Sequence, residues 1–418
     1  MSPQERFFEK SEKKAFDKVM RQKIETSLNN YQKNHALGLT QFENLALAKE
    51  RASYSRWRAI ESLDKFLLEF ENNFVRRGGK VVWAPDAESA LQELENILSA
   101  LKPDEVVMSK SMATEEIGLP AFLEKKNIVI TETDIGKYIQ QQAKERPFHP
   151  VVPAMHKSVE DIASILQINS VDMSAKNVAE KIRSHFPASS LGITGANFLV
   201  ADIGAISIAE NEGNARMGTS WPDVHVVIAG IEKVIPAAGD LEVLLPILAT
   251  YGTGQRVTAY NSLLLGPRMS DEADGPKEMI VILLDNGRSS LLEKPEQRQA
   301  LKCIRCGACL NVCPIFKTIG GQTYETTYNG PIGAVITPIQ VDRKEYKHLT
   351  HASTLCGACT DVCPVQIPLH MNLLANRRDF NEDGMAKGSE KMIWYAWKKG
   401  VLNRKKMNRG AGMKNFFF

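Results

Sequence analysis

The sequence lacks the features that mark membrane, nucleic-acid-binding and secreted proteins. None of its apolar runs approaches the roughly 20 residues of a membrane-spanning helix, so we expect no membrane span. A net charge of +3 with 24% charged residues gives no sign of nucleic-acid binding. The N-terminal residues Met1–Arg6 lack the apolar segment of a secretory signal. We therefore expect a cytoplasmic protein, with two domains as the natural number for 418 residues.

Nucleotide-binding motifs are also absent. The sequence contains neither the G-x-G-x-x-G fingerprint nor a P-loop, and it shows no motif for a flavin or a nicotinamide. Cysteine is absent outside two short runs, which hold all seven cysteines. Disulfides are not expected, because seven is an odd number and the chain shows no secretory signal.

The spacing of the first cysteine run predicts iron–sulfur clusters. Cys303, Cys306, Cys309 and Cys313, followed by Pro314, form the C-x2-C-x2-C-x3-C-P pattern of bacterial ferredoxins. The first three thiolates bind one cluster, and the fourth binds the cluster built on the other run. Structural zinc is the main alternative, but zinc sites usually use paired C-x2-C motifs and need neither a third cysteine nor the proline.

The second run predicts that the two sites are unequal. It contains Cys356, Cys359 and Cys363 before Pro364, and Ser353 stands where its first cysteine belongs. Crossing the ligands gives site one four thiolates, a complete set for a [4Fe–4S] cluster: Cys303, Cys306, Cys309 and Cys363. Site two has three thiolates: Cys313, Cys356 and Cys359. Its cluster is then either [3Fe–4S], or [4Fe–4S] with Ser353 or another non-cysteine ligand on the fourth iron.

The sequence pattern divides the whole chain into four predicted regions. Residues 1–77 form an N-terminal helical arm, because charges of both signs interleave with apolar residues at helical spacing. In residues 78–290 short apolar strands alternate with helices, which indicates a parallel sheet flanked by helices. Residues 291–385 carry the cysteine runs, with helices around each and a long ordered loop between them. Residues 386–418 form a basic, aromatic tail.

The α/β region is expected to form one open sheet. Its strands are predicted at 80–84, 105–108, 128–131, 191–194, 198–202, 205–209, 224–230, 256–260 and 278–285. Its helices are predicted at 86–101, at 114–125 with Thr114 as the cap, and at 240–250, with further helices between 150 and Pro187.

Loops at the strand ends supply a candidate ligand pocket. Ligands of open α/β sheets sit beyond the carboxyl ends of the strands. The polar candidates for such a pocket are Asn197, Glu212, Asn214 and Arg216, around Gly213. Ordinary turns are the alternative, since Asn-Gly and Asp-Asn-Gly are common turn signals. For Asp285–Arg288 the turn is favoured, and for Glu210–Arg216 the two interpretations are balanced.

The tail combines aromatic residues with Lys and Arg and has no Asp or Glu from Lys391 onward. Docking to a partner, or folding back over the cluster region, is favoured over an interfacial membrane contact, because the stretch is short and interrupted by glycine. A peripheral position at the membrane stays open.

With these residues in view, the chain resembles the lactate utilisation protein B family, the iron–sulfur subunits of a three-part L-lactate utilisation system. The matching segments include both cysteine runs and five others: 110–118, 192–198, 211–214, 227–233 and 285–289. The resemblance implies a LUD domain, similar in fold to sugar-phosphate isomerases and CoA transferases. It implies that an α-helical ferredoxin domain with two clusters follows.

The resemblance also implies a part in oxidising L-lactate to pyruvate. The implied partners are a cysteine-rich iron–sulfur protein, a second LUD protein and an unidentified electron acceptor. Lactate oxidation formally removes a hydride, which an iron–sulfur cluster does not accept in one step, so we expect a partner to carry that chemistry. Two alternatives stay open: Lewis-acid catalysis on a hydroxy acid at the open corner of site two, and a redox-sensing scaffold.

Overall fold

The computed structural model describes residues 1–168, 175–186, 189–385, 388–405 and 407–408. The described strands form two sheets. In the larger sheet the described strands lie in the order β1-β10-β7-β4-β2-β3, and every neighbouring pair is parallel. Its strands are β1 (Lys80–Ala84), β2 (Glu105–Met108), β3 (Val129–Glu132), β4 (Leu191–Thr194), β7 (Val224–Gly230) and β10 (Glu278–Leu284).

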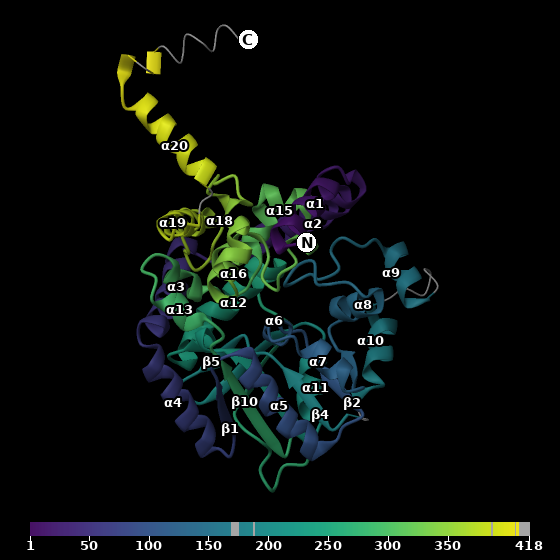
Figure 1. The fold of residues 1–418 in the computed structure, drawn as a ribbon. Helices are drawn as coiled ribbons and strands as arrows, with labels where there is room; N and C mark the ends of the chain where they lie inside the picture. Colours follow the sequence, from purple (N-terminus) through teal and green to yellow (C-terminus); the bar gives the residue numbers. More distant parts are fainter. Residues whose placement is uncertain (169–174, 187–188, 386–387, 406, 409–418) are drawn as a thin grey trace.

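Both faces of this sheet are covered, which explains the continuous Val and Ile runs of its central strands. One face packs against α5 (Ala87–Leu101), α6 (Met112–Glu116) and α7 (Leu119–Lys125). Over the opposite face, α8 (Ile135–Ala143) and α10 (Ala175–Arg183) cover β2. Other residues of that face, on β7 and β10, join the main core of the protein. Figure 1 shows these layers in the lower half of the molecule.

The smaller sheet corrects the expectation of a single open sheet. It contains β5 (Phe198–Val200), β6 (Ala205–Glu210), β8 (Val234–Ile235) and β9 (Tyr260–Leu264), in the order β8-β5-β6-β9. β5 and β6 form an antiparallel hairpin, and so short a connection cannot join two strands of a parallel sheet. The strand expected at 256–260 begins instead at Tyr260.

Further helices of the α/β region are α9 (Val159–Leu166), α11 (Asn214–Ser220), α12 (Leu241–Thr253), η3 (Ile231–Lys233) and η4 (Ala238–Asp240). The helix expected at 114–125 is divided into α6 and α7, and Ser111 rather than Thr114 is the cap residue of α6. Gly118 separates the two helices with a φ of 71°, a conformation that glycine adopts without strain. The predicted stop at Pro187 lies outside the described residues.

The N-terminal arm is helical, as predicted, but it shares a core with the cluster region. Its helices are α1 (Pro3–Ala15), α2 (Lys18–Leu39), α3 (Leu45–Glu61) and α4 (Leu63–Arg76). Ser62 ends α3 and is the N-cap residue of α4. Buried apolar residues of the arm, of the smaller sheet and of the cysteine region form one continuous hydrophobic core. Figure 1 shows α1 beside α15, far along the sequence.

The cysteine region is built from short helices. They are α13 (Arg288–Leu292), η5 (Gln297–Lys302), α14 (Ala308–Val312), α15 (Pro314–Ile319), η6 (Gln322–Tyr324), α16 (Gly330–Gln340), α17 (Arg343–Tyr346), η7 (Lys347–His351), α18 (Ala358–Asp361) and α19 (Leu369–Glu382). The long loop expected between the runs is thus largely helical. Pro331 stands at the start of α16, where its missing N–H and fixed φ favour a helix.

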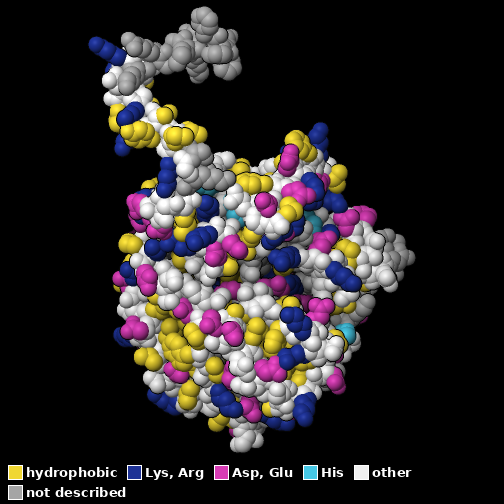
Figure 2. All heavy atoms as spheres, in the orientation of Figure 1, with side chains coloured by type: hydrophobic (Ala, Val, Ile, Leu, Met, Phe, Trp, Pro, Cys, Tyr) yellow, Lys and Arg dark blue, Asp and Glu magenta, His cyan; other side chains and the backbone are white. Residues whose placement is uncertain are grey.

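An α/β region followed by a helical cysteine region confirms the predicted fold class. The tail helix α20 (Gly388–Val401) projects away from the body, so its described residues do not fold back over the cluster region (Figure 1). Its exposed apolar residues include Trp394, Tyr395 and Trp397. Figure 2 shows hydrophobic side chains along this projecting helix. Within the described chain, no helix is both long and apolar enough to cross a membrane.

Candidate iron–sulfur site and adjoining cavity

The two cysteine runs have the same backbone conformation. Arg305 and Leu355, at matching positions, both have a positive φ, 61° and 54°. Each donates its N–H to the side chain two residues earlier: Arg305 to Cys303 Sγ at 3.4 Å, and Leu355 to Ser353 Oγ at 3.1 Å. Ser353 therefore occupies in the second run the place that Cys303 occupies in the first.

The glycines of the two runs match in conformation and differ in surroundings. Gly307 and Gly357 have φ values of 77° and 84°, and α14 and α18 begin directly after them. A Cβ on Gly307 would lie 2.6 Å from Cε1 of His149, whereas a Cβ on Gly357 would meet no described atom within 4 Å. The first run is thus packed against the rest of the protein, and the second run is open.

Four thiols come together at site one. A cavity is lined by Cys303, Cys306, Cys309 and Cys363, with apolar side chains that include Leu310, Ile332, Val365 and Ile367. Burial raises the pKa of the Cys306 thiol, and the thiols of Cys303 and Cys363 raise it further. Burial also raises the pKa of Cys363 to about 11. Thiolates without a cation are unfavourable in this cavity, so it suits a metal centre that supplies positive charge.

Three thiols come together at site two. Burial raises the pKa of Cys359 to about 11, and the thiols of Cys313 and Cys356 raise it further. Cys356 is exposed, and hydrogen bonds from Thr354 and from the backbone of Ala358 lower its pKa. Cys359 also contributes to the raised pKa of Cys309, so the two groups of thiols lie within electrostatic range of each other.

The donor sets fit iron–sulfur clusters. Within the described residues, no three His, Cys, Asp or Glu side chains are close enough to hold a single metal ion. In a cluster, each thiolate binds a different iron atom, so the ligands stand farther apart than those of one ion. Backbone N–H groups also point at the sulfurs, as from Ile367 to Cys363 Sγ at 3.4 Å, and such hydrogen bonds tune the reduction potential of a cluster.

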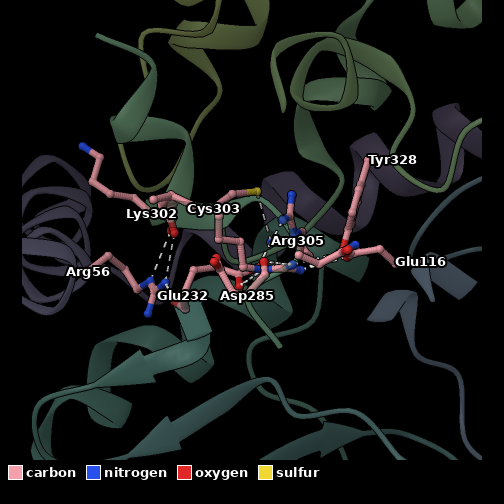
Figure 3. A network of polar contacts seen from close by, with 11 residues as sticks. Arg56, Glu116, Glu232, Asp285, Lys302, Cys303, Arg305 and Tyr328 are labelled. Atoms are coloured by element: carbon pink, nitrogen blue, oxygen red, sulfur yellow. Dashed lines mark hydrogen bonds and ion pairs between the residues drawn. The ribbon is translucent and has the colours of Figure 1, made fainter. Parts of the chain in front are cut away.

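A buried ionic network joins site one to the α/β region (Figure 3). Arg288, almost completely buried, donates from Nη1 and Nη2 to the two carboxylate oxygens of Glu116, each at 2.8 Å. Its Nε donates to Glu232, whose other oxygen lies 3.2 Å from Nη2 of Arg305. The guanidinium of Arg305 lies 4.2 Å from the centre of the Tyr328 ring. Arg305 stands between Cys303 and Cys306 in sequence, so the network reaches the ligands of site one.

Arg56 of the N-terminal arm holds the same region from the other side (Figure 3). Its buried guanidinium donates to the carbonyl oxygens of Val234 at 2.7 Å, Leu301 at 3.1 Å and Lys302 at 3.2 Å, and also to that of Glu232. The arm, the smaller sheet and the residues just before Cys303 are therefore fixed to one another through a single side chain.

A second cavity, of about 400 Å³, lies where β2, β4 and β7 end. It adjoins the cavity of site one, because the two share five lining residues: Met112, Pro150, Ile304, Arg305 and Tyr328. We refer to it as the sheet-end cavity. This is the position at which open α/β sheets bind ligands.

Three of the four pocket residues proposed from the sequence line the sheet-end cavity: Asn197, Glu212 and Asn214. The prediction that Arg216 lines this pocket is wrong, because its side chain is exposed and Arg216 is not among the described residues that line the cavity. The reason is the turn into α11, in which the carboxylate of Glu210 accepts the backbone N–H groups of Ala215 and Arg216 at 2.7 and 2.8 Å. The side chain of Arg216 consequently starts from the outer side of the helix.

The cavity has acidic and basic walls. Burial and the nearby carboxylate of Asp134 raise the pKa of Glu212 to about 7. Asp134 pairs with Lys110 at 2.9 Å. The basic wall contains Arg288, Arg305 and Lys233, and burial lowers the pKa of Lys233 to about 8.

Neither Lys233 nor Arg305 was singled out from the sequence, and an ordinary turn was favoured for the loop that carries Arg288. Asp285–Arg288 was predicted as a turn, and Gly287, with a φ of 83°, does form one; Arg288 nevertheless enters the ionic network. Lys233 follows the end of a predicted strand, and this position was the one sequence feature that could have indicated it. Arg305 lies inside the cysteine motif, which drew attention to the cysteines and not to the residues between them.

Comparisons with known proteins agree with this organisation. Residues 67–284 match the model of the LUD domain, and residues 299–367 match the 4Fe-4S dicluster domain. A lactate utilization protein B of Geobacillus sp. (strain WCH70) is 38% identical over 402 residues, which cover 91% of this chain and 84% of that protein. The lactate utilization protein B of Bacillus subtilis (strain 168) is also 38% identical, over 85% of this chain and 78% of its own.

This chain belongs to the lactate utilization protein B family. A further relative, the uncharacterized electron transport protein YkgF of Escherichia coli (strain K12), is 37% identical over 92% of this chain and 85% of its own. Among solved structures, a DUF162 family protein from Deinococcus radiodurans covers 53% of this chain and 98% of its own, at 15% identity and a TM-score of 0.31. The matched dicluster domain and the grouped cysteines identify an iron–sulfur protein.

Proposed function

We propose that this chain transfers electrons within an L-lactate-oxidising system, through one cluster at each cysteine site. The observation that carries the proposal is the order of the sites in space. The sheet-end cavity shares five lining residues with site one, site one lies beside site two, and site two reaches the surface at the exposed Cys356. This arrangement suits a path for electrons from a buried ligand to a partner at the surface.

The proposed ligands are those deduced from the spacing. Site one would hold a [4Fe–4S] cluster on Cys303, Cys306, Cys309 and Cys363. Site two would hold a cluster on Cys313, Cys356 and Cys359, with Ser353 at the fourth position. Each cluster, when bound, supplies reversible one-electron transfer. The chain contributes low-polarity surroundings at site one and N–H donors to the sulfurs.

The names of the relatives support lactate utilisation and electron transport as the setting. We propose a cysteine-rich iron–sulfur protein and a second LUD protein as partners, one of which provides the hydride-accepting cofactor. The final electron acceptor is a further partner, and the exposed edge of site two is its proposed point of contact.

Lewis-acid catalysis at site two is the second candidate. Two features favour it. Ser353 leaves one corner of the cluster without a thiolate, and the exposure of Cys356 places this site at the surface. A carrier cycles between oxidised and reduced forms without altering lactate, whereas a Lewis acid converts its substrate without net reduction of the clusters. The two functions are therefore separated by following cluster reduction and product formation together.

The test uses protein purified or reconstituted without oxygen. We expect seven to eight irons with matching sulfide, full reduction by dithionite, reoxidation by an added one-electron acceptor, and no conversion of L-lactate by this chain alone. Bound zinc, no more than four irons, or steady lactate oxidation by the isolated chain would contradict the proposal.

A further inference from the structure

The basic wall of the sheet-end cavity contains more positive charge than its protein partners balance. Arg288 is matched by Glu116 and Glu232, and Glu232 is shared with Arg305. Nη1 of Arg305 is buried and has no hydrogen-bond partner among the described residues. Buried donors of a charged group are rarely left unpaired, because the loss of water is not compensated.

Lys233 is the clearest case. It follows β7 at the end of η3 and lines the cavity. In the part of the chain that the structure describes, its ammonium group forms no hydrogen bond or ion pair, although Glu232 is adjacent in sequence. Both carboxylate oxygens of Glu232 are taken by Arg288 and Arg305. The ammonium group of Lys233 is therefore available to bind an anion in the cavity.

The negative charge at site one reaches Lys233 but does not pair with it directly. Cys303 lies within electrostatic range of the Lys233 ammonium group, yet among the described residues no hydrogen bond or ion pair joins the two. Arg305 lines both cavities, so part of its charge balances the thiolates of site one. Lys233 lines the sheet-end cavity but is not among the described residues that line the cysteine cavity. Lys233 therefore lines the space in which a ligand would sit.

We propose that Lys233 and Arg305 bind the carboxylate of a small 2-hydroxy or 2-oxo acid in the sheet-end cavity. A single carboxylate satisfies two donors at once, as charge-assisted hydrogen bonds do. Glu210, Glu212 and Asp134 also line the cavity, and carboxyl groups there disfavour a ligand with several negative charges. A monoanion with a neutral hydroxyl or oxo group suits both walls better than phosphate or a dicarboxylate. Arg305 would then lie between the ligand and the cluster at site one. This inference rests on the proposed function and adds to it the binding site for the acid.

The test is isothermal titration calorimetry on the full chain with both clusters, without oxygen. The probes are L-lactate, pyruvate, L-lactamide and inorganic phosphate. We expect L-lactate or pyruvate to bind, and L-lactamide, which lacks the carboxylate charge, to bind at least about tenfold more weakly. Phosphate should bind more weakly than the acids.

The decisive variant is Lys233→Met, with Lys125→Met, an exposed lysine at the end of α7, as the matched control. Lys233→Met should weaken acid binding by about tenfold or more, Lys233→Arg should restore part of it, and Lys125→Met should leave it unchanged. Iron content and the visible spectrum establish that each variant holds its clusters. Arg305→Gln should show the same loss of acid binding. Because Arg305 lies between two cysteines, its replacement can also disturb the cluster, so the Lys233 variants are the deciding ones.

Acid binding to Lys233→Met at the wild-type affinity would overturn the proposal. So would equal binding of L-lactate and L-lactamide, tighter binding of phosphate, or no binding of either acid to the wild type. Electron transfer is measured separately, by reducing the clusters with dithionite and reoxidising them without any acid. If the clusters cycle normally while the acids fail to bind, the carboxylate site is wrong and the electron-transfer function stands.

Discussion

The two cysteine sites are near-repeats in sequence and differ in what surrounds them. Both runs place a left-handed residue and a left-handed glycine at the same positions, and both end in Cys-Pro. Site one lies against the sheet-end cavity and the buried network of Arg288, whereas site two has an exposed cysteine and a serine in place of the fourth. One local structure, used twice, thus gives an inner site and an outer site.

The difference in burial between the two sites indicates in which direction electrons would pass through the protein. An inner site can meet a buried ligand, and an outer site can meet a partner protein. The same difference is seen at two matching glycines: an added Cβ would collide with a neighbour at Gly307 and would meet no described atom at Gly357. Four experiments test it, from the largest expected effect to the smallest.

Replacing Arg288 should damage site one and spare site two. Arg288→Met leaves the carboxylates of Glu116 and Glu232 buried without their main cation, which should lower the free energy of unfolding by about 3–5 kcal/mol. Because Glu232 also binds Arg305, we expect the cluster at site one to be lost first on mild heating. Chemical denaturation gives the stability, and electron paramagnetic resonance gives the order of loss. Equal loss from both sites would mean that the network does not support site one specifically.

The matched glycines allow a direct comparison of packing. Gly307→Ala and Gly357→Ala both place alanine at a positive φ, which costs roughly 1–2 kcal/mol. Gly307→Ala adds a collision with the buried ring of His149, so it should be the more destabilising of the two. Thermal unfolding of the two variants under the same anaerobic conditions measures the difference. If Gly357→Ala proved as harmful, the second run would be as tightly enclosed as the first.

Ser353→Cys should make the outer site resemble the inner one. A serine hydroxyl is a poorer iron ligand than a thiolate, because its proton is harder to remove at neutral pH. In the wild type, brief exposure to air should release the iron at that corner and leave a [3Fe–4S] signal. The variant should resist this loss. The same [3Fe–4S] signal in both proteins, or in neither, would show that Ser353 is not the missing corner.

The smallest effect concerns the acidic residues of the sheet-end cavity, which adjoins site one. The pKa of Glu212 is about 7, above its ordinary value of 4.5, because of burial and Asp134. The folded protein therefore favours protonated Glu212, so this stabilisation is full below the ordinary value and is lost as pH rises through about 7.

Glu212→Gln removes that titration and keeps an oxygen to accept the N–H of Ile135. The melting temperature of the wild type, relative to that of the variant, should fall between about pH 4.5 and about pH 7. Glu124→Gln, at an exposed position on α7, serves as the control. A constant difference across this range would mean that Glu212 does not titrate there.

The grouping of the cysteines could be predicted from the sequence, because iron–sulfur chemistry depends on short spacings. Matching the two runs residue by residue also placed Ser353 opposite Cys303, and the shared backbone conformation agrees with that match. The sequence did not predict that the basic residues of the cavity come together. Lys233, Arg288 and Arg305 come from three separate segments, and their convergence depends on packing among all of them, which no local pattern records.

The errors have similar causes. The hairpin of β5 and β6 has strands as apolar as those of a parallel sheet, so the second sheet was not distinguishable by composition. Arg216 was assigned to the pocket with its neighbours, but the turn into α11 directs it outward. Sequence reasoning located the loop correctly and misjudged the direction of one side chain.

The central claim is that electrons pass from the inner site to the outer one. The most direct measurement uses the complex purified from native cells without oxygen, with L-lactate added and the clusters followed by electron paramagnetic resonance. In the wild type, lactate should reduce both clusters. In Cys363→Ala, which lacks site one, dithionite but not lactate should reduce site two. In Cys356→Ala, lactate should reduce site one while transfer to the acceptor stops. Reduction of site two by lactate in Cys363→Ala, or undiminished transfer in Cys356→Ala, would contradict the account.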